Sequence, residues 1–234
     1  MSAVDYQVDG KPYEGFFVRP AEKSNVPLVV IAHAWGGLGD NERQKAQLVA
    51  DKLGYAAFAM DVYGKGKRGT SVEECQDLMN PLVGDRAELQ KRLAGGLAAA
   101  KAQDGLDGSK AAAIGYCFGG LSVLDMARAA QSVLGVCSFH GLFRPAENLP
   151  SPKIKAKVLI EHGWQDPMAT PQDVLAIAKE LDGAGADWQL HAHGQSMHAF
   201  TTLGANDANM GTVYNADADR RSFASLTDFL AEIF

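Results

Sequence analysis

Short apolar runs and amphipathic segments alternate along most of the chain. Residues 26–33 form an apolar run rich in β-branched side chains, and a glycine-bearing loop and a helical pattern over 41–54 follow it. This order recurs, and such alternation predicts a mostly parallel sheet with helices on both faces. Further strands are predicted over 55–64, 110–116, 132–141, 155–163 and 186–193, and further helices over 71–80, 85–103, 118–130, 171–185 and 220–234.

The first segment has a different pattern. Between residues 6 and 20, polar and apolar side chains alternate around Asp9-Gly10, a dipeptide favoured in tight hairpin turns. We therefore predict an antiparallel ribbon at the N-terminal edge of the sheet. The proline-containing stretch over 143–153 is too short to separate two domains. Because 234 residues suffice for one large core, a single α/β domain over residues 1–234 is expected.

Composition and charge narrow the choice of partners. The formal net charge is −6, and the lysines and arginines are scattered, which disfavours binding to nucleic acid or to an anionic membrane. No stretch approaches the roughly 18 apolar residues of a membrane span, so we expect a soluble, cytoplasmic protein. The three cysteines lack metal-type spacing, which favours reduced thiols. A small molecule is the expected partner, and the composition is compatible with either a monomer or a homodimer.

The sequence Gly-Tyr-Cys-Phe-Gly at 115–119 lies between a predicted strand and a predicted helix. Its spacing, G-x-C-x-G, is typical of a nucleophile elbow, a sharp turn that needs small residues two positions from the nucleophile. A helix N-terminus also favours the thiolate form of a cysteine such as Cys117. The alternative is a buried cysteine that acts as a small hydrophobe. We prefer that alternative for Cys137, in an apolar strand, and for Cys75, on a helix expected to be exposed.

Two later residues complete a candidate triad. Asp166 follows the strand predicted over 155–163, and His198 follows the strand predicted over 186–193. Both side chains are therefore expected at the carboxyl edge of the sheet, where open α/β sheets bind ligands. Singly, the aspartate could start a turn and the histidine could be an ordinary loop residue. Their order after Cys117, acid and then histidine, favours a nucleophile with a base and a carboxylate that orients the base.

Two backbone N–H groups are candidates for an oxyanion hole. Phe118 starts the predicted helix after the elbow, and Trp35 lies in the loop after an earlier strand, where the second donor is normally found. Metal catalysis is the main alternative, since several histidines lie near predicted strand ends. However, no H-E-x-x-H motif is present, and the glycines at 36–39 lack both common phosphate-binding patterns. We therefore predict no metal, nucleotide or other cofactor.

Several short segments, distributed over nearly the whole chain, together match the pattern of one known family. They are VVIAHAWGG (29–37), MDVYGKG (60–66), IGYCFGG (114–120), EHGWQDPM (161–168), and the stretch from MHAF (197–200) to ADRRSFASLTDFL (218–230). This set resembles the dienelactone hydrolase family of α/β-hydrolases, which has a Cys, Asp and His triad. The resemblance implies that Cys117 is the nucleophile, that His198 is the base oriented by Asp166, and that Trp35 and Phe118 are the oxyanion donors.

The chain departs from the dienelactone-cleaving members at two places. Those enzymes carry a glutamate in the oxyanion loop, where this chain has Ala34, and an arginine soon after the catalytic histidine, where it has Thr201 and Thr202. These differences point away from dienelactone itself as the substrate. Arg86 and Lys67 are candidate replacement cations, although either is also compatible with an ordinary surface charge.

Aromatic residues near the predicted site suggest an apolar substrate pocket. Trp164 and Phe200 are the candidate substrate contacts, but core packing would equally account for them. The main functional hypothesis is hydrolysis of a small carboxylic ester or lactone through an acyl-enzyme on Cys117. The alternatives are a thioesterase or acyltransferase that uses the same triad, and a non-catalytic binding protein with this fold.

Overall fold

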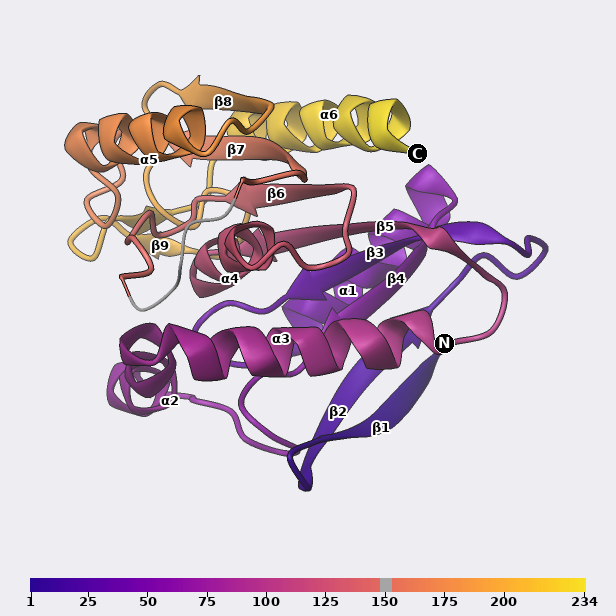
Figure 1. Cartoon of the computed structure of the whole chain (residues 1–234). Helices are drawn as coiled ribbons and strands as arrows, with labels where there is room; N and C mark the ends of the chain where they lie inside the picture. Colours follow the sequence, from indigo (N-terminus) through magenta and orange to yellow (C-terminus); the bar gives the residue numbers. More distant parts are fainter. Residues whose placement is uncertain (148–152) are drawn as a thin grey trace.

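The computed structural model describes residues 1–147 and 153–234, so part of the proline-containing stretch over 143–153 lies outside the described residues (Figure 1). Eight strands form one sheet in the order β1-β2-β4-β3-β5-β6-β7-β8. These strands are β1 (Ser2–Val8), β2 (Lys11–Val18), β3 (Val26–Ala32), β4 (Ala56–Met60), β5 (Leu106–Tyr116), β6 (Gly135–Phe139), β7 (Lys157–Gly163) and β8 (Trp188–His193).

The direction of the strands follows the predicted pattern. β1 pairs antiparallel with β2 through a turn in which Asp9 and Gly10 have φ values of 50° and 73°. β2 is antiparallel to β4, and every further pair out to β8 is parallel. The predicted fold class is therefore confirmed, including the N-terminal edge ribbon.

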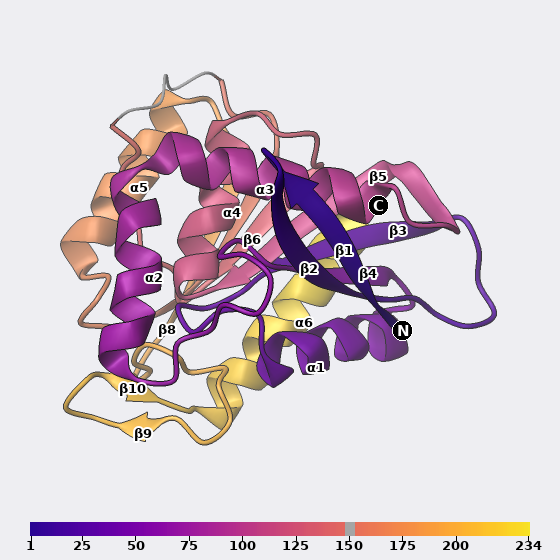
Figure 2. The same cartoon turned by 90° about the horizontal axis from the view of Figure 1, so that it is seen from below.

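Helices cover both faces of the sheet (Figure 2). Leu89 and Leu93 of α3 pack in one core with α4 and α5, whereas Leu226 and Phe229 of α6 pack in the opposite core with α1. Each face is thus sealed by the apolar stripe of amphipathic helices. The helices are α1 (Asp40–Leu48), α2 (Val72–Gly84), α3 (Arg86–Lys101), α4 (Phe118–Arg128), α5 (Pro171–Gly183) and α6 (Ala216–Ile233).

Several local features differ from the sequence prediction. α1 continues into a π-helical turn, Val49–Leu53, before Gly54 ends it in the left-handed conformation. Two short strands, β9 (Asn206–Asp207) and β10 (Thr212–Val213), were not predicted because each has only two residues. α6 begins before residue 220, since the Asn215 side chain caps the N–H groups of two following residues. Cys75 is buried, not exposed as expected.

The carboxyl ends of the parallel strands bring together loops that are distant in the sequence. The loop after β3, the junction of β5 and α4, and the loops after β7 and β8 all emerge at this edge. In the described ranges, no helix combines the length and the apolar character that crossing a membrane would require.

Candidate active site

Cys117 occupies a strained turn between β5 and α4. Its φ of 56° and ψ of −115° lie outside the regions that side-chain-bearing residues ordinarily adopt. The turn is held from both sides, because the Cys117 N–H donates to the Phe139 carbonyl (3.1 Å) and its own carbonyl accepts from the Gly120 N–H (2.9 Å). A strained backbone of this kind persists only where many surrounding contacts hold it in place, as they do at active sites.

The two glycines of the G-x-C-x-G pattern are required by close packing. A Cβ on Gly115 would lie 2.0 Å from the carbonyl oxygen of Gly119. A Cβ on Gly119 would lie 2.1 Å from the carbonyl oxygen of Ala32, at the end of β3. Backbone atoms cannot yield at these distances, so the elbow can form only with glycine at both positions. The physical reason given for the motif therefore applies to this chain.

Asp166 and His198 meet at the same edge of the sheet. Nδ1 of His198 lies 2.7 Å from Oδ2 of Asp166, and the other carboxylate oxygen accepts the Met168 N–H at 2.8 Å. Both side chains are buried. Their loops are joined by the Gln165 N–H, which donates to the Ser196 carbonyl at 2.8 Å. The aspartate thus fixes the orientation of the imidazole ring.

One of the two ring nitrogens of His198, Nε2, has no hydrogen-bond partner among the described residues. This nitrogen is buried, and the other, Nδ1, is engaged by Asp166. Burial lowers the pKa of His198, but the interaction with Cys117, chiefly through charge, and the hydrogen bond to the Asp166 carboxylate outweigh this effect and raise it to about 10. The surroundings of His198 therefore favour the protonated form of its imidazole ring.

The loop after β3 and the start of α4 carry the two proposed backbone donors. Within residues 1–147 and 153–234, neither the Trp35 N–H nor the Phe118 N–H has a hydrogen-bond acceptor. Tyr63 contacts both residues: its hydroxyl donates to the Trp35 carbonyl at 2.8 Å, and its ring stacks on Phe118 with centroids 5.9 Å apart. Burial, and secondly the charge of Cys117, raise the pKa of the Tyr63 hydroxyl, so it stays protonated.

A carboxylate that was not anticipated supports the loop containing Ala34. Glu42 of α1 is buried, and its Oε2 accepts the Gly39 N–H at 2.8 Å. Its Oε1 faces the Ala34 N–H at 3.5 Å, which is a weak contact. Glu42 comes three residues after Gly39, which is the spacing of a helix capping box. That spacing is the signal by which the residue could have been found.

A second buried imidazole packs against His198. The rings of His140 and His198 are 5.1 Å apart in an edge-to-face arrangement, and Nε2 of His140 shares a 2.9 Å hydrogen bond with the Thr201 hydroxyl. Burial, and then the positive charge of His198, hold the pKa of His140 well below its usual range. His140 is therefore neutral and acts as a wall of the site.

The predicted aromatic substrate contacts have different environments. Trp164 is 48% exposed, with its ring beside that of His162, so it remains available to a ligand. Phe200 is fully buried between the rings of His140 and His193. Its assignment as a substrate contact is corrected on this ground, because its side chain is part of the core.

The proposed role of Arg86 in substrate binding is also corrected. Its guanidinium forms a bidentate pair with the buried carboxylate of Asp125, with both N–O distances at 2.5 Å. Asp125 also accepts from Arg128, which in turn pairs with Glu180 of α5. Arg86 therefore links helices and has no free face for a substrate carboxylate. Lys67, the other candidate cation, is exposed.

Three of the histidines near the strand ends, His33, His191 and His193, have partners other than a metal. Both ring nitrogens of His33 bond to backbone groups, at 2.7 and 3.2 Å. His191 and His193 share the buried carboxylate of Glu161, at 3.1 and 2.7 Å. In the part of the chain that the structure describes, no three or more His, Cys, Asp or Glu side chains are grouped so as to hold a metal ion.

This sheet order, with an elbow after β5 and an Asp–His pair beyond β7 and β8, defines an α/β-hydrolase. The chain belongs to the dienelactone hydrolase family, whose model matches residues 13–234. It is accordingly an enzyme, a carboxylic ester hydrolase of the dienelactone hydrolase kind.

Known proteins are similar to most or all of this chain. A dienelactone hydrolase-like promiscuous phosphotriesterase from metagenomic libraries is 31% identical, with a TM-score of 0.94 over 100% of this chain and 98% of that one. An uncharacterized Caenorhabditis elegans protein is 34% identical over 157 residues, which are 65% of this chain and 99% of that protein. A Klebsiella pneumoniae protein described as a dienelactone hydrolase shares the fold, with a TM-score of 0.81 at 19% identity and coverage of 98% and 97%.

Proposed function

We propose that the protein hydrolyses small carboxylic esters or lactones through a thiol ester on Cys117, with His198 as the base and Asp166 as its orienting carboxylate. The observation that carries this proposal is the environment of His198. One ring nitrogen is bonded to Asp166, the other is free, and the charge of Cys117 raises the pKa of the ring. This is the arrangement that a thiolate nucleophile and its proton carrier require.

The steps follow from these groups. The Cys117 thiolate attacks the substrate carbonyl carbon, and the electron pair of the C=O bond moves to the oxygen, which accepts the Trp35 and Phe118 N–H groups. The tetrahedral adduct then expels the alkoxide, which takes a proton from His198. Water next attacks the thiol ester and gives its proton to His198. The thiolate leaves, and a carboxylic acid is released as the second product.

The surroundings favour an uncharged substrate. The Arg86 guanidinium is already paired with Asp125, and Thr201 bonds His140, so neither group is free to bind a substrate carboxylate.

The similar promiscuous phosphotriesterase makes phosphotriester cleavage a second candidate activity for the same nucleophile. Transfer of the acyl group to a thiol or alcohol instead of water is a further variant. We also propose that residues 1–234 act as one domain.

A substrate panel tests the proposal. An uncharged aryl ester, a lactone, a thioester and a phosphotriester would be assayed with the wild type, His198→Ala and His191→Ala. We expect turnover of the carboxylic esters, loss of at least a hundredfold in kcat for His198→Ala, and little change for His191→Ala, which lies outside the site. Equal activity in all three proteins would contradict the assignment. Added thiol or alcohol would reveal acyl transfer, and no turnover at all would favour a binding protein.

Tyr63→Phe tests the oxyanion hole. The variant keeps the ring on Phe118 but loses the hydroxyl that holds the Trp35 carbonyl, so the Trp35 N–H should be less well aligned. We expect kcat for ester hydrolysis to fall about tenfold with KM nearly unchanged, since the donor acts mainly on the transition state. Tyr55→Phe is the control, because Tyr55 packs on Phe234 away from this loop. An unchanged kcat for Tyr63→Phe would contradict the claim that the Tyr63 hydroxyl positions the Trp35 N–H.

A further inference from the structure

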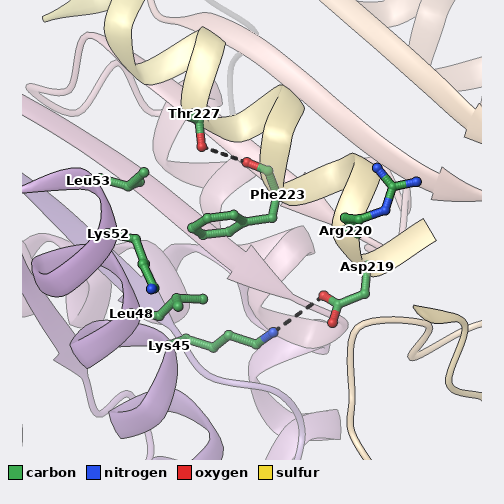
Figure 3. A pocket seen from close by; sticks show the side chains of 8 residues that line it. All are labelled: Lys45, Leu48, Lys52, Leu53, Asp219, Arg220, Phe223 and Thr227. Carbon is green, nitrogen blue, oxygen red and sulfur yellow. Dashed lines mark hydrogen bonds and ion pairs between the residues drawn. The ribbon is translucent and has the colours of Figure 1, made fainter. Parts of the chain in front are cut away.

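A groove separate from the predicted triad lies between α1, its π-helical extension and α6 (Figure 3). It has a volume of about 430 Å³, which lies within the ~300–1,000 Å³ typical of small-molecule sites. Leu48, Leu53 and Phe223 provide apolar walls, and in Figure 3 the Phe223 ring lies between the two elements.

The charges around the groove are unbalanced. Three cationic side chains line it, Lys45, Lys52 and Arg220, against the single carboxylate of Asp219, which lies 3.6 Å from Lys45. Arg220 lies 3.3 Å from Asp217, which is outside the lining. Because the Arg220–Asp217 pair is largely exposed and therefore weak, the lining keeps more positive than negative charge, in a chain with a net charge of −6. Apolar walls with a cationic rim are complementary to a ligand that has an apolar body and one anionic end.

Lys45 connects the groove to the site. Only 16% of its side chain is exposed, and its Nζ lies 3.6 Å from Asp219 and donates to the Thr201 carbonyl at 3.2 Å. The same Nζ lies over the ring of Tyr116, the residue before Cys117. Thr201 in turn bonds His140, whose ring packs on that of His198. A contiguous series of contacts therefore joins a cation in the groove to the histidine proposed as the base.

We propose that this groove binds a small amphipathic carboxylate, and that binding slows catalysis by drawing Lys45 away from Thr201. The link to catalysis rests on the proposed function, which releases a carboxylic acid from each ester and so generates a ligand of this class. The carboxylate accepts from Lys45 and the rim cations, and the apolar chain lies along Leu48 and Phe223. Without the hydrogen bond from Lys45 to the Thr201 carbonyl, the segment that contains His198 and Thr201 is held less firmly.

Calorimetric titration with octanoate tests binding without relying on catalysis. Wild-type protein would be compared with Lys52→Glu/Arg220→Glu and with Lys11→Glu/Lys179→Glu, which changes the net charge equally on exposed positions outside the groove. We expect octanoate affinity to fall at least tenfold only in the groove variant, and octan-1-ol to bind more weakly than octanoate to the wild type. Equal octanoate affinity in all three proteins would overturn the proposal.

Steady-state kinetics tests the link to catalysis. Saturating octanoate should lower the kcat of the wild type about fivefold or more with KM nearly unchanged, and should leave the groove variant unaffected. A rise in KM alone that persists in the groove variant would show ordinary product binding at the catalytic cysteine and would overturn the coupling. If the wild type proved inactive toward esters, the proposed function would fail, while calorimetry would still decide whether the groove binds a carboxylate.

Discussion

Replacing Cys117 by alanine should lower kcat/KM for ester hydrolysis by about 10⁴-fold or more. The residues of a catalytic unit act together, so loss of the nucleophile removes the covalent route and leaves only the smaller contribution of the backbone donors. The elbow places this side chain in a strained turn at the start of α4, beside a histidine whose pKa it raises. Initial rates on an uncharged aryl ester measure the effect.

Cys137→Ala is the matched control for this experiment. Cys137, like Cys117, has a free thiol, but it is buried within β6 and its alanine variant leaves the elbow intact. We expect its activity to remain within a few-fold of the wild type at temperatures where both proteins are folded. Retention of most activity by Cys117→Ala would rule out the thiol as nucleophile, whatever the result for Cys137→Ala.

Asp125→Ala should reduce the free energy of unfolding by about 3–5 kcal/mol. The Asp125 carboxylate is fully buried and receives hydrogen bonds from the guanidinium groups of Arg86 and Arg128. Removing it leaves Arg86 without a carboxylate partner in a buried position, and an uncompensated buried charge is costly. Equilibrium unfolding in urea, monitored by circular dichroism, measures the difference.

An exposed ion pair provides the comparison for this measurement. Asp40 lies 3.8 Å from Arg43 and is largely exposed, so Asp40→Ala should cost no more than about 1 kcal/mol. If Asp125→Ala were as mild as Asp40→Ala, Arg86 would be free to take another partner. Arg86 would then again be a candidate for binding a substrate carboxylate.

The sheet and the elbow were predictable because their signals are local. Each apolar run over 26–33 or 155–163 is long enough to identify a buried strand, and the glycines flanking Cys117 are required by backbone contacts within the turn. The meeting of Asp166 and His198 was also predictable, since both residues follow parallel strands and such strands end at one edge of a sheet. The functional roles of these three residues stay predictions.

The features that escaped prediction depend on partners distant in the sequence. Arg86 is a helix residue with no nearby sign of its buried partner, because Asp125 is 39 positions away. Phe200 follows the predicted catalytic histidine, yet its ring faces the core. The contact of Tyr63 with Trp35, and that of Lys45 with Thr201, likewise arise only when separate loops pack together.

The most direct test of the central claim is mass spectrometry of the enzyme during turnover. Wild-type protein mixed with an uncharged aryl ester and quenched in acid within milliseconds should carry one acyl group, and peptide mapping should locate it on Cys117. The Cys117→Ala variant should carry none. An acyl group on a different residue, or ester turnover with no acyl group on Cys117 at any quench time, would contradict the account.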